Sequence, residues 1–404
     1  MSLRDQIESE IRERGPIPFS RYMEICLYDP AEGYYSRNAN QFGKAGDFYT
    51  SSDVHAVFGR LLARQFEEMW ESLDCPPQLE ILELGPGRGL FARDVLDWSR
   101  KKFPEFFAAL RYTLQESSPA LQTKLRETLG EHIGIGKAKI LHVETRPTAS
   151  SGPAIYRTSS RETPLIVFAN EFFDALPVEI LSAQGKLHIA LDRDHLTELW
   201  LPPTNDELDF LDRYSVHPEV AGKVTVEVSG SETGNDNERI EVPLAAQRWL
   251  TQTANAIQRG FLLVVDYGYE RSEQLAGRHR GTLMACRQHS ASANAYQAPG
   301  EQDLTAHVNF TALTAAAEQS GMCAERLITQ SQFLLGIGEK TQFADAFEDC
   351  RVPQERAKVA LQLKHLVTPA GMGETFHVLV ASRGIDPARV AALSGLSFGG
   401  THTG

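Results

Sequence analysis

The chain has 404 residues, of which 42% are hydrophobic and 23% are charged, so it is long enough for one large or two ordinary globular domains and is neither disordered nor fibrous. Lys and Arg number 40 against 53 Asp and Glu, and the formal net charge of −13 disfavours a nucleic-acid partner. No apolar run approaches the roughly 20 residues of a membrane helix. The five cysteines lie far apart without close pairs, so we expect no metal site and free thiols in a reducing compartment.

Residues 1–75 are predicted to form an N-terminal helical segment. Leu3, Ile7 and Ile11 recur at four-residue steps among acidic and basic side chains, as in an amphipathic helix and not a targeting peptide. We therefore expect a cytoplasmic protein. A glycine- and tyrosine-rich stretch, residues 29–53, interrupts the helical pattern as a long loop.

Short apolar runs alternate with amphipathic helical patterns from residue 76 onward. Strands are predicted at 79–84, 112–115, 140–143 and 165–169, and helices at 90–98 and 119–129. This alternation is typical of an α/β protein whose parallel sheet is covered by helices on both faces.

Residues 178–243 change to alternation with a period of two and are predicted to be a β-rich insertion with a polar loop at 229–238. The core, residues 76–384, resumes after it. We expect in order a helix at 244–257, a strand at 261–266, a helix at 311–319, a strand near 325–328, a helix at 354–366 and a strand at 376–381. Residues 385–404 are predicted to be a frayed tail.

A glycine loop at residues 80–89 is the most informative segment. A buried strand meets a helix there through Gly85, Gly87 and Gly89, which lets the backbone approach a ligand beside unpaired helix N–H groups, although a tight turn without a ligand is the alternative. Dinucleotide-binding enzymes have the spacing G-x-G-x-x-G, whereas this loop has G-x-G-x-G. Glu83 would also repel a pyrophosphate but suits the cationic amino-acid part of S-adenosylmethionine. We therefore expect S-adenosylmethionine, with an NAD-dependent oxidoreductase as the weaker alternative.

Glu116 ends the second predicted strand, just before Ser118 and Pro119, which are a suitable start for a helix. A carboxylate at this place can accept both hydroxyl protons of a ribose, so Glu116 is the expected ribose ligand. NAD enzymes use the same device. Glu116 therefore supports a nucleoside without deciding which one, and a solvated strand-end acid is the alternative.

Polar side chains also follow the fourth predicted strand. Asn170, Glu171 and Asp174 stand at the edge of the sheet where open α/β proteins bind ligands, together with Phe172 and Phe173. The aromatic pair is as compatible with the core as with a substrate platform. The three polar residues are harder to explain by packing, so we expect them at the active site.

The chain resembles the class I methyltransferase family of the mitochondrial complex I assembly factor and its bacterial relatives. The segments that carry the resemblance span most of the chain in order: Gly46-Asp-Phe-Tyr-Thr-Ser51, Glu83-Leu-Gly-Pro-Gly-Arg-Gly89, Asn170-Glu-Phe-Phe-Asp-Ala-Leu-Pro177, Asp266-Tyr-Gly268 and Asp303-Leu-Thr-Ala-His-Val-Asn-Phe310. The chain departs from the usual pattern at Tyr49, Ser52, Asp53 and Asn309, which bears more on the substrate than on the cofactor.

The resemblance implies a Rossmann-like, mostly parallel sheet of seven strands, S-adenosylmethionine as the methyl donor and a protein substrate. For the mitochondrial members it implies symmetric dimethylation of an arginine in a complex I subunit. No nucleic acid or metal is expected. The sequence does not decide whether the chain forms a homo-oligomer.

Methyl transfer needs an acceptor lone pair aimed at the methyl group, and an arginine guanidinium has none until it loses a proton. Glu171 and Asp174 are the expected groups that orient the guanidinium and accept its proton, with Asp266 and Tyr267 as further candidates. The alternative acceptor is an amide or amine nitrogen held by Asn170, which could also contact the cofactor. A second alternative is an S-adenosylmethionine-binding assembly factor with little turnover. His307 is a candidate base or a structural histidine.

Residues 34–51 form a long loop with glycines at 33, 43 and 46, and long loops in compact domains are usually functional. We expect this loop to cover the cofactor. Gly46, Asp47, Thr50 and Ser51 are the expected contacts, although Asp47 could simply end a turn.

Overall fold

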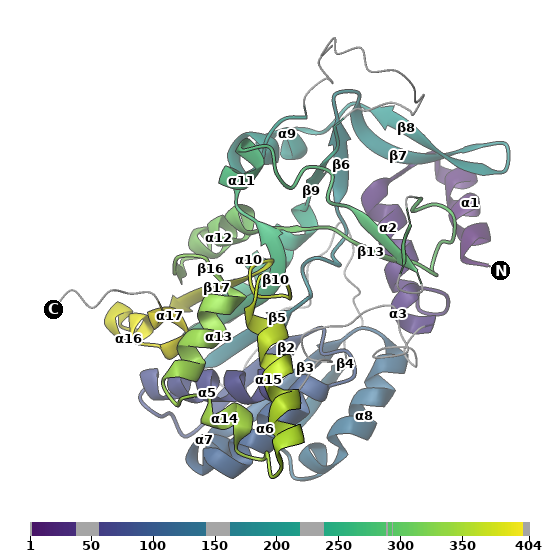
Figure 1. The fold of residues 1–404 in the computed structure, drawn as a ribbon. Coiled ribbons are helices and arrows are strands. Elements are labelled where there is room, and N and C mark those ends of the chain that lie inside the picture. The colour runs from purple at the N-terminus through teal and green to yellow at the C-terminus, as the bar shows by residue number, and fades with distance from the viewer. Residues whose placement is uncertain are drawn as a thin grey trace.

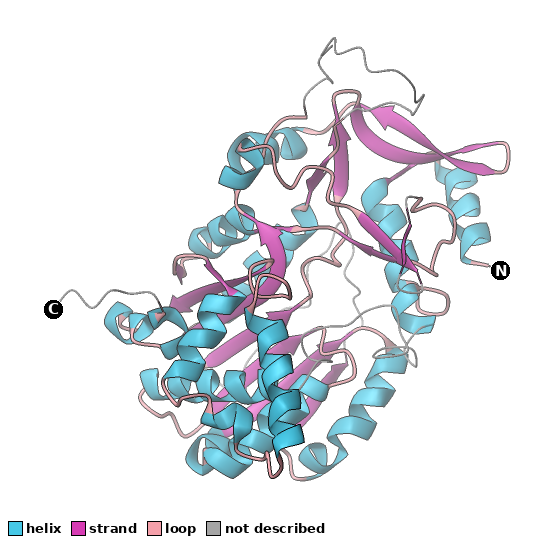
Figure 2. Ribbon diagram, viewed as in Figure 1, coloured by secondary structure: helices cyan, strands magenta, loops and turns pink. Residues whose placement is uncertain are grey.

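The computed structural model describes residues 2–37, 56–142, 162–218, 238–287, 290–292 and 294–398. Two sheets dominate it, a large one between layers of helices and a smaller one beside the N-terminal helices (Figure 2). None of the helices in these ranges is long and apolar enough to cross a membrane.

The large sheet forms the core of the protein. Its main path runs β15 (Cys323–Ala324), β17 (Phe376–Arg383), β10 (Gly260–Tyr269), β5 (Leu165–Asn170), β2 (Leu79–Leu84), β3 (Leu110–Glu116) and β4 (Ala138–His142), while β14 (Val308–Asn309) and β16 (Ile328–Thr329) pair with β10 and β17. Strands β4, β3, β2, β5 and β10 are parallel, and β17 is antiparallel to β10. The predicted α/β class and the mostly parallel methyltransferase sheet are confirmed.

Helices cover both faces because successive strand residues point to opposite sides. Ile81 of β2 belongs to one apolar cluster, and its neighbour Leu82 belongs to the other. The first cluster includes residues of α5 (Ala56–Ser72), α6 (Leu90–Lys102), α7 (Pro104–Ala109), α8 (Pro119–Gly134), α13 (Gln330–Glu339), α14 (Ala344–Phe347) and α15 (Pro353–Val367). The second includes residues of α10 (Leu244–Ala256) and α12 (Phe310–Gln319).

The smaller sheet joins two distant parts of the chain. It consists of β1 (Ile17–Pro18), β7 (Gly185–Asp192), β6 (Glu179–Ser182), β9 (Ile240–Val242) and β8 (His195–Leu201). It packs against α1 (Leu3–Arg14) and α2 (Phe19–Tyr28), which are followed by α3 (Tyr34–Arg37) (Figure 1). The N-terminal strand β1 thus completes the sheet of the predicted insertion.

The insertion is rich in strands, with β6 to β9, and it also contains a helix that we did not predict from the sequence. Helix α9 (Asn205–Tyr214) lies within it and begins at a capping box made by Thr204 and Glu207. A three-stranded sheet of β12 (Ser290–Ser292), β11 (Met284–Arg287) and β13 (Asp303–Thr305) follows α11 (Arg271–Leu275), and its strands are too short to show periodicity in the sequence.

The C-terminal part differs from the prediction in two places. The single strand expected near 325–328 is split into two short strands, β15 just before this segment and β16 beginning at its last residue, Ile328, and α13 follows them. The expected frayed tail instead forms α16 (Pro387–Ala391) and α17 (Ser394–Ser397), where Val390 and Leu393 are buried against the core. Few apolar residues anchor these turns, so the sequence pattern is weak. Residues 399–404 lie outside the described chain.

Candidate functional site

The glycine loop connects the end of β2 to the start of α6. Gly85, Gly87 and Gly89 have φ angles of 62°, 54° and 75°, in the left-handed region that favours glycine. A Cβ atom at Gly85 would lie 2.8 Å from the ring of Phe172, and one at Gly89 would lie 2.6 Å from Leu125. At Gly87, no described atom lies within 4 Å of such a Cβ atom. The first and third glycines are therefore required for packing, whereas the second faces open space that a ligand can fill.

Glu116 lies directly beside this loop because β2 and β3 are parallel neighbours, and Gly85 N–H donates to the Gln115 carbonyl oxygen at 3.0 Å. The Glu116 carboxylate accepts the Ser118 N–H at 2.8 Å. Burial raises the pKa of Glu116 to about 7, against the opposing effect of hydrogen bonds from the backbone amides of Ser118, Ser117 and Gly87. The predicted loop and the predicted strand-end carboxylate thus meet at one place.

Glu83 lies beneath the loop on β2 and is almost fully buried. The hydroxyl of Tyr112 donates to its Oε2 at 2.9 Å. Burial raises the pKa of Glu83 to about 8, and the charge of Glu116 adds to this effect. A cation beside these two acids would favour their charged forms.

The segment after β5 forms a tight turn around a buried carboxylate. Asp266 of β10 is fully buried, and its Oδ2 accepts the backbone N–H groups of Phe172, Phe173 and Asp174 at 3.2, 3.0 and 3.4 Å. Glu171 enters the turn with a φ of 49°, which is unfavourable for a residue with a side chain. Strained backbone of this kind is often found at functional sites.

Asn170, Glu171 and Asp174 come together at this turn, as expected. The Asn170 amide donates to Glu171 Oε1 at 3.2 Å, and the Tyr267 hydroxyl donates to Asp174 Oδ2 at 2.6 Å. Asp174 Oδ1 is buried and has no hydrogen-bond partner among the described residues. Burial raises the pKa of Asp174 to about 6. No helix begins at Asp174, since turns lead to β6, so it does not act as a helix cap.

The family segment at residues 303–310 lies at the same edge of the sheet. The Ala306 N–H donates to the Asp174 carbonyl oxygen at 3.0 Å, and the ring of His307 lies 5.3 Å from that of Tyr267. Asn309 caps α12 by accepting the Ala312 N–H at 3.0 Å.

Two tyrosines that the sequence did not single out border this edge. The Tyr28 hydroxyl donates to the Ala175 carbonyl oxygen at 2.9 Å, and the Tyr35 hydroxyl donates to Asp303 Oδ1 at 3.3 Å. The carbonyl oxygen of Tyr35 also accepts the Ser118 hydroxyl at 3.1 Å. The N-terminal segment thus reaches from the end of β3 to the residues that follow the 170–174 turn. In the sequence, only the clustering of tyrosines at residues 28–35 could have indicated that these two side chains border the site.

The predicted covering loop is described only at its start, in α3. Gly46, Asp47, Thr50 and Ser51 lie outside the described residues. Their expected contacts with the cofactor therefore stay predictions.

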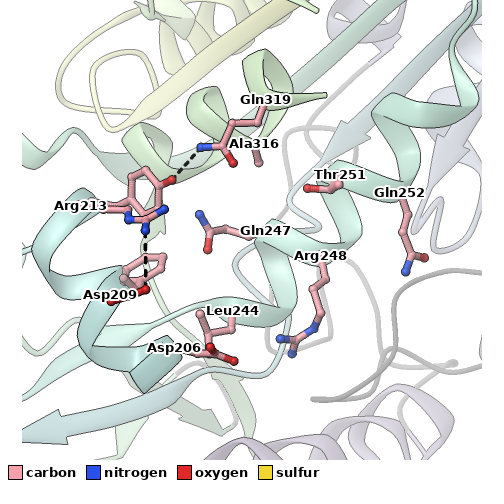
Figure 3. Close-up of a pocket in the computed structure, with 12 residues that line it drawn as sticks. Asp206, Asp209, Arg213, Leu244, Gln247, Arg248, Thr251, Gln252, Ala316 and Gln319 are labelled. Carbon is pink, nitrogen blue, oxygen red and sulfur yellow. Dashed lines mark hydrogen bonds and ion pairs between the residues drawn. The ribbon is translucent and has the colours of Figure 1, made fainter. Parts of the chain in front are cut away.

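A pocket of about 380 Å³ lies elsewhere, between α9, α10 and α12. Figure 3 shows Asp209 and Arg213 of α9 on one side and Gln247 of α10 and Gln319 of α12 across from them. Two carboxylates and two guanidinium groups line it, so its charge is balanced. None of its lining residues belongs to the glycine loop or to the 170–174 turn, so this pocket is separate from the predicted site.

A mostly parallel sheet with a final antiparallel strand, a glycine loop after β2 and a buried acid at the end of β3 define a class I methyltransferase. A model of the S-adenosyl-L-methionine-dependent methyltransferase family matches residues 61–328, and the chain belongs to this family. The resemblance drawn from its sequence segments is confirmed.

Similar proteins cover nearly the whole chain. The protein arginine methyltransferase NDUFAF7 homolog of Drosophila melanogaster is 29% identical over 400 residues, covering 95% of this chain and 85% of the relative. Protein arginine methyltransferase NDUFAF7 of Xenopus tropicalis is 30% identical over 345 residues, covering 81% and 74%.

A crystal structure of a Burkholderia thailandensis protein bound to S-adenosyl-homocysteine has 25% identity and a TM-score of 0.74, and the match covers 98% of this chain and 94% of that one. The family and this neighbour show that the methyl donor is S-adenosylmethionine. The open space at Gly87 and the two buried acids beside it fit a ligand that is cationic and carries a ribose.

Proposed function

We propose that this methyltransferase modifies a guanidinium nitrogen of an arginine in a protein substrate. The observation that carries the proposal is the buried oxygen Asp174 Oδ1, which has no partner among the described residues and lies at the catalytic edge of the sheet. A buried carboxylate oxygen without a partner is costly, and a guanidinium supplies the donors that it lacks. The names of the relatives as protein arginine methyltransferases support the same substrate class.

The donor would be held by the residues around the glycine loop. Gly85, Gly87 and Gly89 bring the backbone close to it, Glu116 accepts from the ribose, and Glu83 favours its positive charge. Asn170 lies at the end of the adjacent strand β5 and is a further proposed contact. When bound, S-adenosylmethionine supplies a methyl group on a positively charged sulfur.

The acceptor would be held by the turn after β5. Asp174 and Glu171 orient the guanidinium and offset its charge, while Asp266 keeps the turn in shape through three backbone hydrogen bonds. Tyr267 fixes the orientation of the Asp174 carboxylate from the other side. Symmetric dimethylarginine is the product that the family resemblance suggests.

Asn170 supports a second candidate, methylation of an amide or amine nitrogen. It stands where its side chain could hold a planar NH2 group, although its own amide donates to Glu171 in this structure. In this case the acceptor needs hydrogen-bond partners more than carboxylates, and Asn170 would matter more than Asp174.

Quantitative mass spectrometry of proteins from cells with and without this chain tests the proposal. We expect methylarginine to disappear from at least one peptide and to return with the wild-type chain but not with Asp174→Asn. A lost methyl group on another residue type would favour the second candidate. An unchanged methyl-proteome, with the purified chain still binding S-adenosylmethionine, would instead favour an assembly factor with little turnover.

A further inference from the structure

Two histidines from different segments meet beside the acceptor turn. The Nδ1 atoms of His279 and His307 are 3.0 Å apart. His279 follows α11 with a φ of 53°, and its ring stacks on Tyr269 at 5.2 Å. The backbone N–H of His307 donates to the Thr282 hydroxyl at 3.1 Å. The ring of His279 is thus held by Tyr269, and that of His307 packs edge-on against Tyr267.

The contact determines where the ring protons lie. A hydrogen bond between two Nδ1 atoms needs one donor and one acceptor, and a neutral imidazole carries its proton on one nitrogen only. Glu273 Oε1 lies 3.8 Å from His279 Nε2, which is beyond hydrogen-bond distance, and its negative charge favours a proton on that nitrogen. His279 Nδ1 is then the acceptor and His307 Nδ1 the donor.

This order leaves a lone pair on His307 Nε2. No residue in the described part of the chain forms a hydrogen bond to this nitrogen. Burial, followed by the nearby His279, lowers the pKa of His307 to about 4, so its ring is neutral near pH 7. The neutral ring therefore keeps a lone pair on Nε2 that can accept a hydrogen bond or the proton of a strongly acidic N–H group.

His307 is also in the right place. Its ring contacts that of Tyr267, which donates to Asp174, and the preceding residue Ala306 donates its N–H to the Asp174 carbonyl oxygen. The carboxylate of Asp266, by contrast, is occupied by four backbone amides, three on Oδ2 and that of Tyr267 on Oδ1. His307 is therefore a neutral nitrogen base that is linked to the proposed acceptor turn through Tyr267 and Ala306.

We propose that His307 Nε2 accepts the proton of the acceptor nitrogen, and that His279 and Glu273 are positioning residues that keep this nitrogen bare. The inference rests on the proposed arginine acceptor. An N–H proton of the guanidinium moves to His307 Nε2, and the electron pair left on that nitrogen forms the new N–C bond. The sulfur of the donor keeps the electron pair of the broken C–S bond.

The contact between the two histidines also offers a route by which the accepted proton can leave the site. The Nδ1 proton of His307 can shift to His279, whose Nε2 proton faces the half-exposed Glu273. The other titratable groups around the pair are Tyr267 and Tyr269 on β10, Glu270 beside α11, His377 on β17 and Asp174.

NMR of the full chain with ¹⁵N-labelled histidine measures the tautomers without any substrate. We expect His307 to be protonated on Nδ1 in the wild type and to shift toward the Nε2-protonated form in His279→Phe, which keeps the ring on Tyr269 but removes the acceptor. Glu273→Gln should shift it partly, and His195→Phe, on an exposed strand, should not. The proposal is overturned if His307 is protonated on Nε2 in the wild type, or if its tautomer is the same in the wild type and in His279→Phe.

Methyl transfer from tritiated donor to proteins of cells lacking the chain supplies the second measurement. His307→Phe should lower kcat about 100-fold or more, with little change in affinity for S-adenosylmethionine. His279→Phe should lower kcat less, in step with the fraction of His307 that NMR shows to be protonated on Nε2, which a purely structural role would not do. A retained rate in folded His307→Phe overturns the proposal. Methyl groups on a residue other than arginine would overturn the proposed function while leaving the tautomer order intact.

Discussion

Replacement of Gly87 by alanine should separate ligand binding from folding. Gly87 has a φ of 54°, and a side chain in the left-handed region costs about 1 to 2 kcal/mol. No described atom lies within 4 Å of the added Cβ atom, so no clash adds to this cost. We therefore expect Gly87→Ala to fold, with a free energy of unfolding lower by about 1 to 2 kcal/mol.

The added methyl group would occupy the space beside the loop that we assign to the donor. We expect affinity for S-adenosylmethionine and S-adenosyl-homocysteine to fall at least about tenfold, which corresponds to about 1.4 kcal/mol. Isothermal titration calorimetry with both ligands measures this loss, and denaturant unfolding measures the stability of the same preparations.

Gly136 provides a matched control. It lies after α8 with a φ of 72°, and a Cβ atom there also has no described atom within 4 Å. Gly136→Ala should have the same backbone cost and normal affinity. Equal affinities of the two variants would refute the placement of the donor at Gly87. Gly89→Ala should instead lose stability, because its Cβ atom would lie 2.6 Å from Leu125.

Four further predictions follow from the site and the C-terminal helices. Glu116→Gln should weaken both the donor and its demethylated product by about 1 to 3 kcal/mol in calorimetry, whereas a loss for the donor alone would mean that Glu116 senses the sulfonium. Asp174→Asn should lose methyl transfer with donor affinity kept, and normal turnover with a lowered Tm would mean a structural role. Glu83 has a pKa raised by burial from 4.5 to about 8, so the folded state holds its proton more tightly and the stability that this group contributes is lost as pH rises through about 8. Between pH 4.5 and about 8, the Tm of Glu83→Gln should fall less steeply than that of the wild type. Parallel curves of Tm against pH would contradict the raised pKa of Glu83. Leu393→Ala should cost about 2 to 5 kcal/mol in denaturant unfolding, and exposed Leu361→Ala almost nothing, if α16 and α17 belong to the folded core.

The main features of the site could be predicted from local sequence. Gly85, Gly87 and Gly89 between an apolar run and a helical pattern indicate a ligand loop, because few other arrangements need three glycines. Glu116 and Asn170 could be placed near this loop because the carboxyl ends of parallel strands meet at one edge of a sheet. This reasoning needs only the type and direction of each strand.

Other features depend on contacts between distant segments. Tyr35 meets Asp303 across 268 residues, and His279 meets His307 across 28, and neither pair shows a pattern in the sequence. The last helices look like a tail until the Ser394 N–H is seen to donate to the buried carboxylate of Glu68.

Periodicity thus determined the layers of this protein, and the spacing of three glycines determined the loop, since both depend on residues close in the chain. Short strands such as β1 and β13, and side-chain contacts such as that of Tyr267 with Asp174, have too few residues to leave a periodic signal. Only the packing of the whole chain decides them, because each is stabilised by partners that the local sequence does not contain.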